Sequence, residues 1–299
     1  MLRQRFSELL RIVAALSAAA CTTTQTGSNT ASSGSASTST FANVEVSSQG
    51  LPPDADHALA RLSSSPRHGE WVMISIPPSD SVKAWVVYPE RKTKAPVVIV
   101  VHEIFGLSDW IRGVADQLAA DGFIAVAPDF LTMKNLPGGT DSAAIQANVA
   151  AIRTLDAQQV QRMIDGAARY GMAFPSALPR YGVVGFCWGG GVSFAHATHS
   201  ASLDASVVYY GVSPKTEELS SVRAPVLGLY GGNDARVDAT IPPADSAMRA
   251  MGKTYSPRIF EGAGHGFLRQ QTGMNGANMT ATQRGWPATI AWFKRYLGS

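Results

Sequence analysis

The amino-acid sequence predicts an α/β fold in which a mainly parallel, doubly wound sheet is covered on both faces, giving a three-layer α/β/α sandwich. Short apolar runs alternate with helical stretches after residue 95, as expected of a parallel sheet. Two strand-like runs precede them, at 71–76 and 82–87. Beyond residue 50 the chain has roughly 250 residues, enough for one domain with a sizeable core.

The elements follow from these runs in order. The two early runs are expected to form an antiparallel entry to the sheet. Parallel strands are expected at 96–101, 124–127, 181–185, 205–210, 226–230 and 256–260. A final helix over 280–297 carries Trp286, Ile290, Trp292 and Phe293, which we interpret as packing residues and not as a ligand stack.

A sharp turn from strand to helix is indicated by the segment G-F-C-W-G-G at 185–190. Gly185 and Gly189 stand two positions either side of Cys187, where such a turn has room only for small residues. The turn would project the Cys187 side chain over the end of the sheet. It would also place the Trp188 backbone N–H at a helix start, where it can stabilise an oxyanion.

Two further residues follow predicted strands, Asp234 in G-G-N-D and His265 in G-A-G-H-G-F. Nucleophile, acid and histidine in this chain order are typical of the α/β-hydrolase fold, with all three at the carboxyl ends of strands. His265 would serve as the base for the Cys187 thiol, and Asp234 would orient the imidazole. Taken singly, the three residues also suit an inert buried cysteine, a turn residue and a packed histidine.

Over roughly residues 70–297 the domain resembles the dienelactone hydrolase family of α/β-hydrolases. Six segments carry the resemblance: E-I-F-G at 103–106, G-F-I-A-V-A-P-D at 122–129, the cysteine turn at 185–190, V-Y-Y-G-V at 208–212, G-G-N-D at 231–234 and G-H-G-F-L-R at 264–269. The resemblance implies a hydrolase that cleaves ester or lactone bonds of a small molecule through a Cys187 thioester, with no cofactor and no metal.

The resemblance also implies roles for other residues. The glutamate matched by Glu103 accepts the thiol proton when substrate displaces its carboxylate, which leaves a Cys–His ion pair. Ile104 would supply the second oxyanion-hole N–H, beside that of Trp188. Arg269 matches an arginine that binds a substrate carboxylate, although an ordinary solvated arginine is an equal alternative.

The chain departs from the family pattern before the cysteine turn. A second carboxylate-binding arginine has no clear counterpart in 141–171; Arg153 is the nearest candidate, and an exposed, salt-bridging role is favoured for it. Trp188 is bulkier than the leucine expected after the nucleophile and would narrow the pocket. Preference for an anionic lactone therefore stays open.

The amino terminus indicates export. Arg3, Arg5 and Arg11 precede a short apolar run at 12–20, which is typical of a signal peptide. Cys21 resembles the lipidated first residue of a bacterial lipoprotein, with plain secretion or a non-lipidated precursor as the alternative. We therefore predict a signal peptide at 1–20, a flexible Ser/Thr/Gly-rich tether at 21–50 and the hydrolase domain at 51–299. The protein would be anchored to a membrane, facing the periplasm or the cell exterior.

Composition narrows the remaining function classes. The formal charge of +3 falls to about +1 without residues 1–20, which hold three arginines and one glutamate, so nucleic-acid binding gains no support. His196 and His199 lack a third ligand at recognisable spacing, and a packing role is favoured; His102 is interpreted as a strand-end histidine that could tune Glu103. A monomer is favoured. The competing hypotheses are a catalytically inert, tethered binding protein and a thiol redox protein that uses Cys187.

Overall fold

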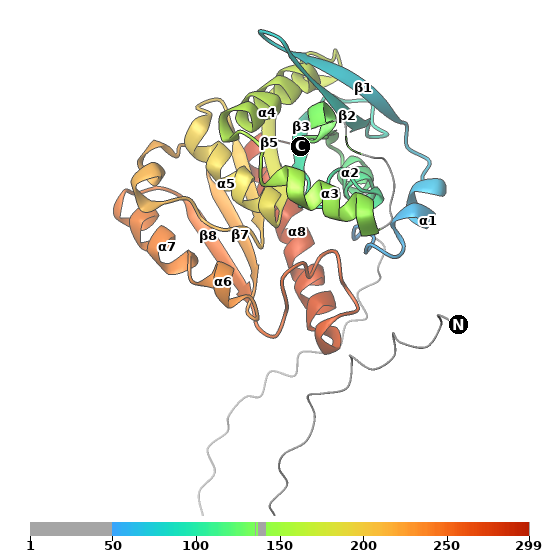
Figure 1. Cartoon of the computed structure of the whole chain (residues 1–299). Helices are drawn as coiled ribbons and strands as arrows, with labels where there is room; N and C mark the ends of the chain where they lie inside the picture. Colours follow the sequence, from blue (N-terminus) through green and yellow to red (C-terminus); the bar gives the residue numbers. More distant parts are fainter. Residues whose placement is uncertain (1–49, 135, 137–141, 299) are drawn as a thin grey trace, which may run out of the picture. The chain divides into compact units, whose positions relative to one another are not determined.

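The computed structural model describes residues 50–134, 136 and 142–298 (Figure 1). Eight strands form one sheet in the order β1-β2-β4-β3-β5-β6-β7-β8. Strand β2 pairs antiparallel with β1 and β4, and every other pairing is parallel. The strands are β1 (Gly69–Ile76), β2 (Asp80–Val87), β3 (Ala95–Val101), β4 (Ile124–Pro128), β5 (Ala177–Phe186), β6 (Ala205–Tyr209), β7 (Val226–Gly231) and β8 (Tyr255–Phe260).

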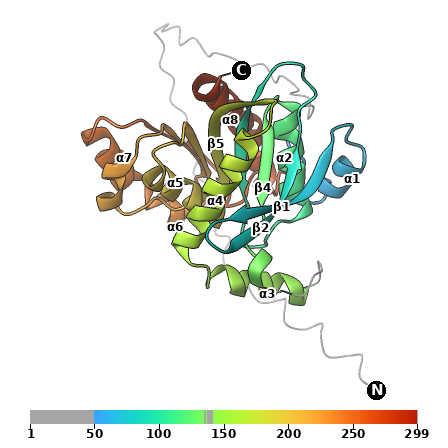
Figure 2. The ribbon, with the colours of Figure 1, turned by 90° about the horizontal axis from the view of Figure 1, so that it is seen from above.

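Helices cover both faces of the sheet (Figure 2). They are α1 (Ala58–Ser63), α2 (Asp109–Ala120), α3 (Ser142–Ile152), α4 (Ala157–Met172), α5 (Trp188–His199), α6 (Ala235–Asp238), α7 (Ile241–Ala250) and α8 (Ala277–Leu297). Helices α2 and α8 pack in one core cluster, and α4, α5 and α7 pack in the other. The predicted fold class, the antiparallel entry and all eight predicted strands are therefore confirmed. One strand is shorter than predicted, because the chain turns to positive φ at Tyr210 and leaves β6.

The central strands are apolar along their whole length because both of their faces are covered. All seven residues of β3 are buried, as are all five of β4 and β6. The final helix packs as predicted, with Trp286, Ile290, Trp292 and Phe293 buried against the sheet. This rigid centre fixes where the carboxyl ends of β3, β5, β6 and β7 lie.

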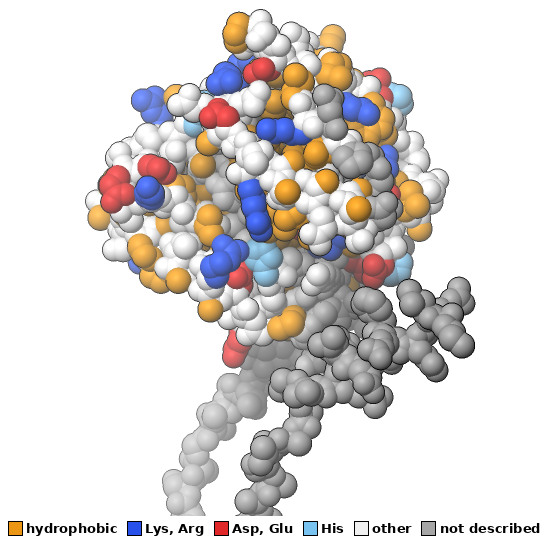
Figure 3. All heavy atoms as spheres, in the orientation of Figure 1, with side chains coloured by type: hydrophobic (Ala, Val, Ile, Leu, Met, Phe, Trp, Pro, Cys, Tyr) orange, Lys and Arg blue, Asp and Glu red, His pale blue; other side chains and the backbone are white. Residues whose placement is uncertain are grey.

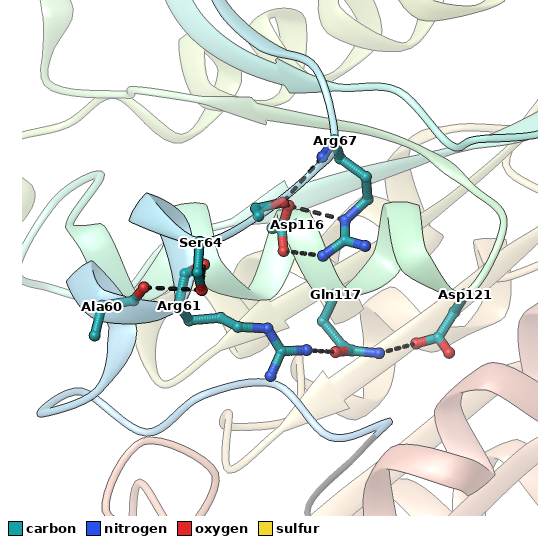
Figure 4. Close-up of polar contacts among 8 residues, drawn as sticks. Ala60, Arg61, Ser64, Arg67, Asp116, Gln117 and Asp121 are labelled. Carbon is teal, nitrogen blue, oxygen red and sulfur yellow. Dashed lines mark hydrogen bonds and ion pairs between the residues drawn. The ribbon is translucent and has the colours of Figure 1, made fainter.

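A polar cluster holds the segment before β1 against α2 (Figure 4). Arg67 donates two hydrogen bonds to the buried carboxylate of Asp116, at 2.9 and 2.6 Å. Arg61 donates to the Gln117 side chain at 2.6 Å, and that amide in turn donates to Asp121 at 3.2 Å. A buried carboxylate is tolerated only when it is paired in this way.

The signal peptide predicted at 1–20, with Cys21, and the tether predicted at 21–50 lie outside the described residues, apart from Gly50. Within the described residues, no helix is both long enough and apolar enough to cross a membrane.

Candidate active site

Cys187 occupies the turn between β5 and α5 with a φ of 57°, the left-handed region that side chains rarely adopt. The two flanking glycines are sterically required. A Cβ on Gly185 would lie 1.9 Å from the Gly189 carbonyl oxygen, and a Cβ on Gly189 would lie 2.4 Å from the carbonyl oxygens of both Val101 and His102. The strained turn thus has the form that the sequence predicts, and its second glycine touches the end of β3.

The Cys187 thiol is largely buried, and burial raises its pKa to about 11. The negative charge of Glu103 contributes to this rise, and the Trp188 backbone N–H and the Arg236 guanidinium partly oppose it. The resting thiol is therefore neutral at physiological pH. Nucleophilic attack requires a group that removes its proton.

Asp234 and His265 are in direct side-chain contact at this edge of the sheet. The Asp234 Oδ2 and His265 Nδ1 atoms are 2.5 Å apart, with Asp234 9% and His265 34% exposed. Because Asp234 occupies Nδ1, Nε2 is the ring nitrogen left for proton transfer. The Tyr210 ring packs against the imidazole at a centroid distance of 5.1 Å.

The structure brings the predicted site residues to one edge of the sheet. Glu103 and Ile104 follow β3, Cys187 follows β5, Asp234 follows β7 and His265 follows β8. In a parallel sheet these carboxyl ends share one edge, where ligands bind. Ile104 and Cys187 line the same hollow.

Glu103 is buried and lies against Arg269. The Arg269 Nε and Glu103 Oε2 atoms are 3.2 Å apart, within ion-pair distance but without the alignment of a hydrogen bond. Burial raises the pKa of Glu103 to about 7, an effect that the Arg269 charge partly opposes. Arg269 also lies over the Phe105 ring, at 4.8 Å from its centroid. The arginine that the resemblance assigns to a substrate carboxylate is thus engaged with Glu103.

His102 holds the loop after β3 in place. Its Nδ1 lies 2.7 Å from the Glu103 carbonyl oxygen, and its Nε2 accepts a hydrogen bond from the Phe130 N–H at 3.2 Å. Burial lowers the pKa of His102, so the ring is neutral and Nδ1 is its donor. These contacts support a structural role at the strand end.

Two hollows open at this side of the domain, one at Cys187 and one beside Arg269. The first, which we call the thiol pocket, has a volume of about 500 Å³ and is lined by Ile104, Leu155, Ala157, Val160, Gln161, Cys187, Trp188, Gly191, Val192, Ala195, Tyr210, Val212 and Arg236. The second, of about 940 Å³, is lined by Arg269 and Phe105 among others. On the face seen in Figure 3, hydrophobic side chains gather over α3, with basic side chains among and beside them.

Other residues discussed from the sequence have structural surroundings. Trp188 lines the thiol pocket and packs on His102 and Phe130, at centroid distances of 5.7 and 5.8 Å. Arg153 is exposed, but within the described residues it has no ion-pair partner, so the expected salt bridge is not present there.

His196 and His199 both lie near Asp165, at 3.7 and 3.2 Å. Among the described residues, no group of three or more His, Cys, Asp or Glu side chains could hold a metal ion.

Three polar side chains in the wall of the thiol pocket were not predicted as site residues. Tyr210 is buried, and its hydroxyl has no hydrogen-bond partner among the described residues. Gln161 comes from α4 and Arg236 from α6. Neither stands in a motif, so only the fold could bring them to Cys187.

A mainly parallel sheet with a strained nucleophile turn, an acid and a histidine at successive strand ends defines an α/β-hydrolase. The dienelactone hydrolase family model matches residues 82–297, and the chain belongs to that family.

Relatives support this assignment. The chain is 31% identical over 232 residues to a Salmonella typhimurium protein described as "Putative carboxymethylenebutenolidase", covering 73% of this chain and 84% of that protein. It is 32% identical over 237 residues to a protein of the same description from Methylorubrum extorquens, covering 75% and 80% of the two chains. The crystal structure of a "Putative Dienelactone Hydrolase" from Klebsiella pneumoniae matches with a TM-score of 0.64 at 28% identity, covering 77% of this chain and all of that one.

Proposed function

We propose that the protein hydrolyses ester or lactone bonds of a small molecule through a Cys187 thioester, with His265 as base and Asp234 orienting it. One observation carries the proposal: the hydrogen-bonded Asp234–His265 pair, 2.5 Å apart, lies at the same sheet edge as the strained turn that presents Cys187. The relatives described as carboxymethylenebutenolidases favour a lactone among these substrates.

Activation begins from a neutral thiol. Substrate displaces the Glu103 carboxylate, which takes the thiol proton and leaves the Cys187 thiolate beside His265, which enters the cycle already protonated. The raised pKa of Glu103, about 7, suits a group that accepts a proton near neutral pH. The buried charge of Glu103 no longer opposes the thiolate once it is neutralised.

Acyl transfer then proceeds in two halves. The thiolate attacks the carbonyl carbon, and the backbone N–H groups of Ile104 and Trp188 donate to the resulting oxyanion. Collapse breaks the carbon–oxygen bond, and the leaving alkoxide takes a proton from His265. Water, deprotonated by the now neutral His265, attacks the thioester, and collapse releases the carboxylic acid and the Cys187 thiolate. The thiolate then takes its proton back from Glu103, which restores the resting state.

We further propose export and attachment to a membrane through lipid on Cys21, as the N-terminal sequence predicts. Labelling of cells with radioactive palmitate tests this proposal. Label should enter the full chain and be lost in a Cys21→Ser variant. Equal labelling of both proteins, or none of either, would contradict lipidation.

Hydrolysis by the full chain tests the catalytic proposal. We expect turnover of 4-nitrophenyl acetate, a neutral lactone or a carboxylated dienelactone to vanish in Cys187→Ala and to survive in Cys21→Ser, the matched control for the second thiol. Turnover that survives Cys187→Ala would disprove the thiol mechanism. Binding of these compounds without any cleavage by the unvaried protein would favour the inert binding protein. Reversible oxidation of Cys187 in the absence of cleavage would favour the redox protein.

A further inference from the structure

Gln161 is a buried amide in the wall of the thiol pocket. It lies in the second turn of α4, only 8% exposed, and lines the hollow that holds Cys187. Its carbonyl oxygen Oε1 lies 2.6 Å from the Nδ1 atom of His196 on α5. A pocket wall of this kind is usually apolar, so a buried amide at this position requires a physical reason.

His196 fixes which end of the amide faces the pocket. The imidazole is fully buried, and burial lowers its pKa to about 3, so the ring is neutral and carries one N–H. The Gln161 carbonyl oxygen can only accept, so Nδ1 carries the hydrogen and donates to it. The other ring nitrogen, Nε2, therefore accepts from the Tyr181 hydroxyl at 3.1 Å, while the Asp165 carboxylate is 3.7 Å away, beyond hydrogen-bond distance.

Tyr181 completes the chain of hydrogen bonds on the side away from the pocket. Its hydroxyl is 2.9 Å from the Ser200 Oγ, which acts as donor when the tyrosine donates to His196. Because Oε1 of Gln161 is held at one end of this chain, the amide nitrogen Nε2 is the end left for the pocket. Within the described residues, the Gln161 side chain makes its hydrogen bond through Oε1, and Nε2 makes none.

The rest of the wall favours an acceptor opposite this nitrogen. Among the described residues, no carboxylate lines the thiol pocket, and Arg236 is the one charged lining residue. Most of the other lining side chains are apolar, Leu155, Val160 and Val192 among them. A donor that faces a mostly apolar pocket rewards a ligand oxygen and discriminates against a ligand that displaces water from it without replacing the hydrogen bond.

We infer that Gln161 is a specificity-determining residue whose amide N–H binds an oxygen acceptor, a ketone or ether oxygen, on the otherwise apolar acyl group of the substrate. This inference rests on the proposed function, since the acyl group must be attached to Cys187. His196, which donates to Gln161, and Tyr181, which donates to His196, act as positioning residues, because neither lines the thiol pocket.

Matched substrates test the inference. We would measure kcat/KM of the full chain with 4-nitrophenyl hexanoate and with the corresponding 4-oxo and 5-oxohexanoate esters. At least one oxo ester should be preferred over the plain ester by about tenfold, mainly through KM. In Gln161→Met, which keeps the volume but removes the donor, this preference should fall to about one. Gln158→Met, on the exposed side of the same helix, is the control and should keep it.

The outcomes are distinguishable. Cys187-dependent turnover with no preference for either oxo ester, or with a preference unchanged in Gln161→Met, would overturn the inference and leave the proposed function standing. No Cys187-dependent turnover would overturn both. Nitrogen-15 NMR of the histidines decides the orientation even if the variant fails to fold. His196 should be protonated at Nδ1; protonation at Nε2 would turn the amide carbonyl toward the pocket and contradict the inference.

Discussion

The carboxylate of Glu103 is held 3.2 Å from the guanidinium of Arg269, and the same carboxylate raises the pKa of the Cys187 thiol. One buried charge is therefore coupled to the nucleophile on one side and to an arginine on the other. A charge that enters the second hollow, which Arg269 lines, can therefore change the pKa of the Cys187 thiol through Glu103.

Removing the Glu103 charge should make the thiol more acidic. In Glu103→Gln, the loss of a neighbouring negative charge lowers the pKa of Cys187 from its value of about 11. We expect iodoacetamide to alkylate Cys187 several-fold faster at pH 8 than in the unvaried protein. Mass spectrometry of the Cys187 peptide measures the rate, and a Cys21→Ser background removes the second thiol. Unchanged or slower alkylation would contradict the coupling.

Glu103 should also affect stability in a defined pH window. Its pKa is about 7 in the folded state and 4.5 in the unfolded chain, so the folded state binds the extra proton between these values. Ionisation above pH 4.5 therefore costs stability as pH rises toward 7. Relative to Glu103→Gln, the unvaried protein should lose roughly 3 kcal/mol between pH 4 and 8. Urea unfolding at a series of pH values measures this difference, and a pH-independent difference would refute it.

Asp234 should act mainly by holding one tautomer of His265. Asp234→Asn keeps the shape but lets the imidazole accept at Nδ1, which places the hydrogen on the catalytic Nε2. We expect kcat to fall by roughly three to four orders of magnitude, with a much smaller change in KM. Steady-state kinetics on the esters named above measure both. A loss of less than tenfold would show that Asp234 is only a turn residue.

Gly189 should be intolerant of any side chain. A Cβ there would meet two backbone oxygens at 2.4 Å, which cannot move without shifting β3 and the loop after it. Gly189→Ala should therefore destabilise the fold by several kcal/mol and abolish turnover. In Gly285→Ala, on α8, the new Cβ would find only ordinary contacts at 3.6 Å and beyond. That control should be neutral or slightly stabilising in thermal unfolding, and equal effects of both changes would contradict the steric argument.

The buried pair of Arg67 and Asp116 should contribute to stability and not to catalysis. Asp116→Ala leaves the Arg67 guanidinium, 12% exposed, without its partner, and we expect a loss of roughly 3 kcal/mol. Asp245→Ala breaks an exposed helix pair with Arg249 and should cost less than about 0.5 kcal/mol. Chemical unfolding of both variants measures the contrast, and similar losses would argue against a role for burial.

The strands were predictable because parallel strands buried on both faces read as continuous apolar runs, as β3 and β4 do. The Cys187 turn was predictable because its sterics demand glycine at fixed spacing. The order of acid and histidine identified Asp234 and His265, whose 2.5 Å contact depends on strand ends being neighbours. Each of these signals is local in sequence and has one physical cause.

The remaining features of the site depend on tertiary packing. The Glu103–Arg269 pair joins residues that are far apart in sequence, and neither residue type indicates a partner. Gln161 faces Cys187 because α4 packs beside α5, and its orientation is fixed by His196, which the sequence presents only as a helix histidine. Arg236 is exposed and stands in no motif. No pattern along the chain encodes such contacts.

Because β8 lies at the edge of the sheet, Cys187 and His265 should differ in how well their positions resist heat. Cys187 follows β5, which has strands on both sides, whereas His265 follows β8, which pairs only with β7. Fraying starts where a strand has one neighbour, so backbone amides of β8 should exchange with solvent before those of β5. A partly opened molecule would keep its thiol in the strained turn after losing the imidazole. Mild warming would therefore abolish proton transfer by His265 first, while Cys187 is still in place.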